Sequence, residues 1–413
     1  MKRMLVLISW LMILGVGVMV LPEKLWSELK WEEKLILEKP EYYLMSIVDT
    51  DSRSIIFTTF PGYEKPEFVV NDKGWVSFVG EIHKETTTGY TGRIEVSFGI
   101  YLWDGKSTRL ISKGRAPSLR ARHLDMNNNG QLVWLEPSGI TYKVCFYNGE
   151  SIRILDEKGR EPTINNNGWV VWVGWNQRKR PSADKYKYEY DAYECIYLWD
   201  GKTIQTITEE KIDDLHIGHS RVFYWLRIND RGCVVWTKET SEASEASLRL
   251  IRDIYLWDGK RVRKLVENGV IPEINDNNWV VWNGWNGRSV SEEVTAPREG
   301  IFLWDGKSVR KLASGRCGGR LKINNNGWVA WNEISNERSE DKEHRRICLW
   351  DGKSVRKFSK FEDAGCWIPD FEICDNGWLI WRPYFGKLHL SKDGIVYHLD
   401  EDGEKFIKVG EWD

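Results

Sequence analysis

The chain of 413 residues has an almost balanced charge, with 59 Lys and Arg, 61 Asp and Glu and a formal net charge of −2. This balance argues against a nucleic-acid partner, because binding of phosphates requires a concentrated basic surface. The length exceeds that of an ordinary domain, and the internal repeats described below account for it.

Residues 1–21 have the order of an export signal. Lys2 and Arg3 precede an unbroken apolar run over residues 4–21, as the basic and apolar regions of such signals do. Small residues such as Gly15 could precede a cleavage site, whereas the length of the run also suffices to span a bilayer. The sequence therefore predicts an extracytoplasmic protein that is either secreted or tethered to the membrane by this segment.

Residues 22–65 are predicted to be a linker followed by strands. Residues 28–38 mix charged and apolar positions, which indicates a short helix or a linker. Residues 42–48 and 54–60 have the composition of two strands. These strands either supply the partners that the last repeat lacks or begin an additional repeat.

From Pro66 to the C-terminus two short motifs alternate, which indicates one structural unit copied several times. The first motif has the form INNNGWVVW and ends at Phe78, Trp134, Trp172, Trp236, Trp282, Trp331 and Trp381. The second has the form IYLWDGK and spans residues 101–106, 145–150, 197–202, 255–260, 302–307 and 348–353, with a weaker copy at 397–405. The direct count is seven units.

Each unit has the pattern of four short strands. The Asn-Asn-Gly turn opens it, because Asn and Gly accept the positive φ of a tight hairpin. Strands two and three (WVVW and IYLW) are apolar at consecutive positions, so both of their faces must be covered. Strand four follows an Asp-Gly-Lys turn and has charged residues that protect a sheet edge. The sequence predicts an all-β fold over residues 66–413, a β-propeller of four-stranded antiparallel blades with seven blades, or alternatively eight or six.

The motifs resemble known propeller repeats. Trp-Asp at the end of strand three, with Gly218-His219 upstream of VFYWLRINDRG, resembles the WD40 repeat. The whole order, PxINxxGWVVW and then IYLWDGxxVRKL, is more similar to the repeats of TolB-like propellers of bacteria and archaea. This resemblance implies a fold rather than a function, because propellers host many unrelated tasks. Some TolB-like propellers have polysaccharide lyase activity on central His residues, so the resemblance also implies that alternative.

The 24 Trp residues invite a sugar-binding interpretation, but most of them occupy three fixed positions of the repeat. Residues fixed by a repeat are more simply explained as packing between blades. Trp175 and Trp285 are exceptions, since they lie just beyond strand two where the chain leaves for a loop. We predict that these two rings stack on a sugar or on a partner side chain.

Catalytic motifs are scarce: the sequence has no GxSxG elbow and no Gly-rich phosphate loop. Asp213, Asp214, His216 and His219 combine carboxylate and imidazole groups that could hold a divalent metal. The alternative is that the Gly-His pair has a purely structural role. We therefore expect no cofactor, with a divalent metal as the alternative.

Cysteines occupy positions that other residues fill in neighbouring repeats. Cys145, Cys233 and Cys348 are predicted to be small, buried replacements for aromatic repeat residues. Cys317 and Cys366 lie in equivalent loops and form the one pair that we nominate for a disulfide.

The connections between strands two and three are long and polar, at residues 81–96, 176–194, 237–252, 286–299 and 332–346. Function in rigid scaffolds is often located on such loops. The sequence predicts an exported, non-catalytic scaffold that binds a protein or glycan ligand through loops on one face and meets the membrane only through its N-terminal segment. The alternative is a metal-assisted, lyase-like enzyme acting on polysaccharides.

Overall fold

The computed structural model describes residues 17–411 with gaps, of which those of six residues or more are 20–35, 60–67, 87–92, 115–121, 182–187, 213–221, 285–299, 335–344, 359–369, 383–388 and 400–405. All regular structure in the described residues is β-strand. In the same residues, no helix has the length and apolar character needed to cross a membrane. The predicted all-β class is therefore confirmed.

The chain divides into two compact units, residues 1–157 with 397–409 and residues 158–396 with 410–413, which we describe separately. In the first unit, one sheet has the order β1-β2-β3-β4, formed by β1 (Gly17–Met19), β2 (Ile36–Lys39), β3 (Tyr42–Val48) and β4 (Ser54–Thr59). The next contains β5 (Phe68–Val70), β6 (Val76–Thr86), β7 (Arg93–Trp103) and β8 (Thr108–Gly114). The third contains β9 (Arg122–Met126), β10 (Leu132–Ser138), β11 (Thr141–Tyr147) and β12 (Ile152–Asp156).

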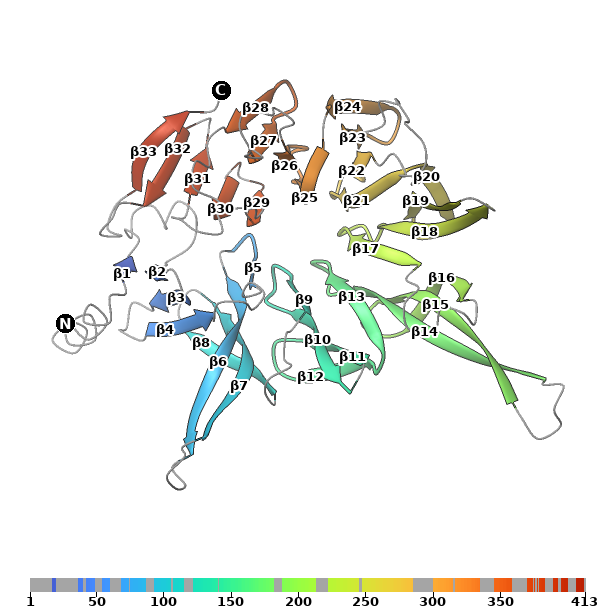
Figure 1. The fold of residues 1–413 in the computed structure, drawn as a ribbon, viewed down its shortest axis with the longest axis horizontal. Coiled ribbons are helices and arrows are strands. Elements are labelled where there is room, and N and C mark those ends of the chain that lie inside the picture. Colours follow the sequence, from blue (N-terminus) through green and yellow to red (C-terminus); the bar gives the residue numbers. More distant parts are fainter. Residues whose placement is uncertain are drawn as a thin grey trace. The chain divides into compact units, whose positions relative to one another are not determined.

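The second unit repeats the same four-stranded sheet (Figure 1). Its first two sheets contain β13 (Gly159–Ile164), β14 (Val170–Pro181), β15 (Tyr188–Trp199) and β16 (Ile204–Ile212), then β17 (Phe223–Ile228), β18 (Val234–Ser244), β19 (Ser247–Trp257) and β20 (Val262–Val266). The next two contain β21 (Gly269–Ile274), β22 (Val280–Gly284), β23 (Gly300–Trp304) and β24 (Val309–Ala313), then β25 (Arg316–Ile323), β26 (Val329–Ile334), β27 (Arg345–Trp350) and β28 (Val355–Phe358). The C-terminal sheet has five strands, β29 (Asp370–Ile373), β30 (Leu379–Arg382) and β31 (His389–Lys392) from the second unit, and β32 (Ile395–Leu399) and β33 (Phe406–Glu411), most of whose residues belong to the first unit.

Local sequence explains each sheet, as the one formed by β13 to β16 illustrates. The Asn165 Oδ1 atom accepts hydrogen bonds from the amides of Asn167, at 3.1 Å, and Trp169, at 2.9 Å, which closes the first turn. Asp200 Oδ1 closes the third turn by accepting from the amides of Lys202, at 2.8 Å, and Thr203, at 2.7 Å. These backbone bonds lower the pKa of the Asp200 carboxyl below its usual value. Both predicted turns are thus formed by the residues that the repeat keeps constant.

Successive sheets pack face to face through apolar side chains. Val171, Val173, Ile196 and Leu198 from the first sheet of the second unit meet Phe223, Leu226, Val234 and Trp236 from the next one in a single cluster. The Trp residues that end strand two are the most deeply buried large side chains, with Trp172, Trp236 and Trp331 each 1% exposed. The packing interpretation of these tryptophans is confirmed. Four-stranded antiparallel sheets stacked on both faces are the blades of a β-propeller.

Asparagine side chains tie three successive blades of the second unit to the blade that follows each of them. The Asn165 Nδ2 group donates to the carbonyl oxygen of Asn229 at 2.9 Å, and Asn229 donates to Asn275 at 2.9 Å. Asn275 continues the series to the carbonyl of Asn324 at 3.0 Å. These amides are buried, so each of the three bonds gives a hydrogen-bond partner to polar groups that water cannot reach.

Blade number and strand extents differ in part from the expectation. The described residues form seven four-stranded sheets and one five-stranded sheet, because β3 and β4 belong with β1 and β2 to a sheet of their own. Residues 17–19 of the predicted export segment form β1, which pairs with β2. The rest of residues 4–21 lies outside the described part of the chain, so export and anchoring stay predictions.

Three of the predicted polar loops are extended β-hairpins instead. Strands β6 and β7 pair from Val76↔Trp103 to Thr86↔Arg93, and β14 and β15 pair from Val170↔Trp199 to Pro181↔Tyr188. Strands β18 and β19 pair as far as Ser244↔Ser247. A two-stranded ribbon that projects beyond its sheet has solvent on both faces, so its residues are polar and resemble those of a loop.

The three described cysteines with a predicted structural role are buried: Cys145, Cys233 and Cys348 are 2%, 7% and 0% exposed. Desolvation raises the pKa of the Cys145 thiol to about 12, so it is protonated at neutral pH. The prediction that these residues replace larger repeat side chains is confirmed. The side chains of Cys317 and Cys366 lie outside the described residues, so their disulfide stays a prediction.

Tryptophan and glycine are matched across the blade interface. A Cβ atom added to Gly232 would lie 2.5 Å from Cζ3 of Trp169 in the preceding blade, and φ at Gly232 is +78°. Gly259, in another turn of the same blade, has φ of +90° but no heavy atom within 4 Å of a built Cβ. The two glycines therefore share the backbone requirement, and only Gly232 also has the steric one.

We predict that Gly232→Ala destabilises the protein more than Gly259→Ala does. Strain at positive φ costs both variants about 1–2 kcal/mol, and overpacking against Trp169 adds about 1–3 kcal/mol to Gly232→Ala alone. Urea denaturation of both glycine variants, of Trp169→Leu, and of Gly232→Ala combined with Trp169→Leu measures the coupling. Equal losses for the two glycine variants, or no coupling to Trp169, would contradict this account.

Candidate functional site

The structure describes one of the six predicted site residues. Trp175 lies on β14 with 40% of its surface exposed. Trp285 and the predicted metal ligands Asp213, Asp214, His216 and His219 lie outside the described residues. No group of three or more His, Cys, Asp or Glu that could hold a metal occurs in the residues that are described.

The β14–β15 hairpin that bears Trp175 projects from its sheet (Figure 1). Side chains alternate between the two faces of a strand, and the register places Trp175 opposite Glu194 and Lys179 opposite Tyr190. All four side chains therefore lie on the same face of the hairpin. Val173, two residues before Trp175, is also on this face and packs in the core between this blade and the next one. We call this side the Trp175 face.

The opposite face of the hairpin is held by ion pairs. The Arg178 guanidinium contacts both carboxylate oxygens of Glu209, at 2.7 and 2.6 Å, and lies 4.5 Å from the ring centroid of Tyr193. Lys211 pairs with Asp191 at 2.8 Å. These residues connect β14, β15 and β16, so charged side chains on this face stabilise the ribbon itself.

The Trp175 face has exposed aromatic rings instead. Tyr190 is 51% exposed and Trp175 is 40% exposed, and Gln177 and Lys179 on the same face are exposed as well. Rings of this kind combine a large apolar surface with a polar tip and are typical of binding surfaces. The Trp175 face is therefore the candidate binding surface of the described residues.

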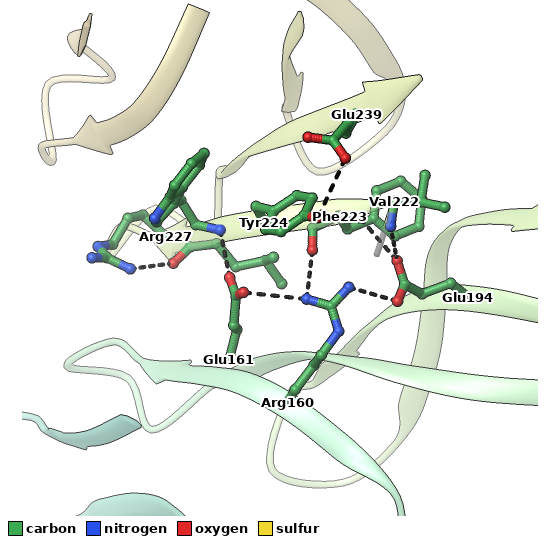
Figure 2. Close-up of polar contacts among 10 residues, drawn as sticks. Arg160, Glu161, Glu194, Val222, Phe223, Tyr224, Arg227 and Glu239 are labelled. Carbon is green, nitrogen blue, oxygen red and sulfur yellow. Dashed lines mark hydrogen bonds and ion pairs between the residues drawn. The ribbon is translucent and has the colours of Figure 1, made fainter. Parts of the chain in front are cut away.

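The base of the hairpin is fixed by a buried charge cluster (Figure 2). Glu194 is fully buried and accepts a hydrogen bond from Arg160 Nη2 at 2.5 Å. Its other oxygen accepts from the amides of Val222, at 2.7 Å, and Phe223, at 2.8 Å, in the next blade. Arg160 Nη1 also donates to the carbonyl of Phe223 at 2.7 Å. One blade thus holds the first strand of the following blade through two side chains.

Glu161 extends this cluster through an unusual backbone. Its carboxylate accepts from Arg160 Nη1 at 3.2 Å and from the amide of Trp225. Glu161 and Trp225 both have φ of 53°, and Ile271 in the next blade has φ of 56°. Each lies four residues before the turn asparagine, within an irregular step of the β-ladder. A β-bulge of this kind redirects side chains.

Sequence reasoning missed the cluster and the bulges. Arg160 and Glu194 are 34 positions apart, and neither belongs to the constant part of the repeat. A signal was available: no other unit has Arg at the first of these positions together with Glu at the second. The bulges had no such signal, because Glu161, Trp225 and Ile271 share neither size nor polarity.

Comparisons with known proteins find only distant structural similarity. No family model and no curated protein matches the chain. Among solved structures, an acylaminoacyl peptidase of Pyrococcus horikoshii has 16% sequence identity and a TM-score of 0.49, with 82% of this chain and 52% of the peptidase covered. The chain thus spans about half the length of that protein.

Two further solved structures are similar over most of the chain. A eukaryotic initiation factor has 12% identity and a TM-score of 0.43, covering 92% of this chain and 86% of its own. An ulvan lyase, a polysaccharide lyase, has 10% identity and a TM-score of 0.24, covering 90% and 81%. At these values neither similarity informs function. The class of protein defined by the blades is the β-propeller.

We predict that Arg160→Met destabilises the protein by about 3–5 kcal/mol, because it leaves the buried Glu194 carboxylate without its cation. Arg178→Met is the matched control. It also breaks an Arg–Glu pair in this hairpin, but Arg178 is 51% exposed, so we expect a loss below about 1 kcal/mol. Equal losses in urea denaturation would show that burial of Glu194 has no energetic consequence.

The metal hypothesis can be tested on the purified protein without structural information on residues 213–219. It predicts close to one equivalent of a transition metal in elemental analysis and loss of that metal when His216 and His219 are substituted together. A folded protein free of metal, prepared without chelator, would contradict the hypothesis.

Proposed function

We propose that the protein is an exported, non-catalytic β-propeller scaffold that binds a protein or glycan ligand through connections between the second and third strands of its blades. One observation supports this most directly: the projecting β14–β15 hairpin exposes Trp175 and Tyr190 on one face. Exposed aromatic side chains gathered on one surface are a frequent mark of an interaction site.

The use of polar groups elsewhere supports a scaffold. Buried amides such as Asn165 and Asn229 bond to the next blade, and Arg160 and Glu194 do the same. Buried charges such as Arg160 and Glu194 thus serve the contact between two blades. The proposal includes no cofactor and no nucleic acid.

The proposal places the scaffold outside the cytoplasm, either secreted or tethered by residues 4–21. Its support is the basic pair Lys2 and Arg3 followed by the apolar run. Contact with the membrane would be through this segment alone.

A shortened hairpin tests the role of the β14–β15 connection. The β10–β11 hairpin shows that a blade forms with a two-residue connection between Ser138 and Thr141. Replacing residues 177–192 by Asn-Gly shortens β14 and β15 to the length of β10 and β11. The shortened hairpin keeps Trp175 and Glu194. The matched control replaces residues 241–250 of the β18–β19 hairpin by Asn-Gly, since that hairpin has no aromatic residue beyond the blade.

We predict that both shortened variants keep the thermal unfolding midpoint within about 2 °C of the parent, because the hairpin tips contribute little buried surface. In a binding screen against a glycan panel and extracytoplasmic proteins, only the 177–192 variant should lose the ligand of the full chain. Retention of every ligand by that variant would contradict the proposal.

A further inference from the structure

The β14–β15 connection differs in composition from the other long connections. Residues 176–194 include four Tyr, and five basic residues against four acidic ones, of which Glu194 is buried. The four other connections, at residues 81–96, 237–252, 286–299 and 332–346, are neutral or net acidic and contain Tyr90 as their one Trp, Tyr or Phe. Aromatic rings and positive charge thus coincide on a single hairpin of a chain with a net charge of −2.

The register defines how these groups lie on the Trp175 face. Tyr190 is level with Lys179, four residues along β14 from Trp175, which separates the two rings by about 14 Å along the strand. Exposed Gln177 lies between the two rings along β14, and exposed Lys179 lies directly across from Tyr190. The surface therefore presents a ring at one end, an amide in the middle, and an ammonium group beside a second ring at the other end.

This order has the chemistry to bind an extended acidic polysaccharide. The apolar faces of sugar rings pack on aromatic side chains, and the polar tips of those side chains remain hydrated. The Gln177 amide can exchange hydrogen bonds with hydroxyl groups. A cation beside the second ring favours a polymer with carboxylate groups over a neutral one. The separation of the rings requires a chain of several sugars rather than a single one.

We propose that the Trp175 face binds an extended acidic polysaccharide, with sugar rings on Trp175 and Tyr190 and a sugar carboxylate at Lys179; this proposal rests on the scaffold function proposed above. The hairpin is preformed for the task. Arg178, Glu209, Asp191 and Lys211 hold its other face, and Glu194, directly opposite Trp175, is anchored in the next blade. Because the ribbon is already ordered, binding need not supply that ordering cost.

The test uses the full chain and polygalacturonate, a polymer of uronic acid, with dextran as the neutral polymer, in isothermal titration. We expect polygalacturonate to bind and dextran to bind at least tenfold more weakly. Trp175→Ala and Tyr190→Ala should each weaken polygalacturonate binding by about tenfold, the loss of one stacking contact. Lys179→Gln should weaken it and reduce its dependence on salt, because the lost contact is the one that salt screens.

The matched control is Lys202→Gln, which makes the same charge change at an exposed residue in the turn between β15 and β16, away from the Trp175 face, and should leave polygalacturonate affinity unchanged. Circular dichroism on all variants confirms that they fold. Equal binding of dextran, binding of a single-stranded oligonucleotide in preference to polygalacturonate, or insensitivity to Lys179→Gln would each overturn the proposal.

Failure of this proposal and failure of the scaffold function give different results. If polygalacturonate does not bind but the 177–192 variant loses another ligand, the scaffold function stands and the acidic polysaccharide is wrong. If the 177–192 variant retains every ligand of the full chain, both proposals are wrong.

Discussion

The fold depends on one side chain that six repeats share, the asparagine that opens the first turn, whereas the last repeat has Cys374 at this position. In Asn165 the carbonyl oxygen of the side chain closes the turn of its own blade, while the amide nitrogen donates to the backbone of the next blade. The side-chain amide of this asparagine therefore shapes the turn within its own blade and also connects that blade to the next one. An aspartate could accept the first bonds but could not donate the second. This explains why Asn recurs at this position, whereas the following residue varies between Asn and Asp.

The tryptophan that follows each turn is matched to its neighbour in the same way. The rings of Trp169 and Trp279 press on Gly232 and Gly327 in the following blades. One interface provides a natural control, since Cys233 occupies the Trp position and the residue that faces it in the next blade is Asn278 rather than Gly. With the ring absent, Asn278 retains φ of 62° and its Oδ1 accepts from Asn229 at 2.7 Å. At this interface the absence of the ring and the presence of a side chain at the facing position occur together.

The sequence was sufficient to predict features that depend on local chemistry. Asn-Gly and Asp-Gly turns, such as those at Asn165 and Asp200, and the buried Trp236 follow from spacing and composition. The extended hairpins were mistaken for loops, because a ribbon exposed on both faces lacks the apolar alternation that identifies a strand. The Arg160–Glu194 pair depends on a neighbour that local patterns do not define. Trp175 was identified because it departs from the repeat, and the structure describes it as exposed.

Residues that differ from the repeat consensus indicate where one blade has a function that the others lack. A symmetric scaffold gives every blade the same turns, core and edge, so a feature found in one blade is not required by the fold. The blade formed by β13 to β16 has two such departures close together, a buried ion pair beneath the hairpin and exposed rings upon it. Glu194 and Trp175 face each other across the two strands. Burial of an ion pair is weak evidence for stability by itself, but it fixes geometry. A fixed base beneath an exposed aromatic surface is what a preorganised binding site requires.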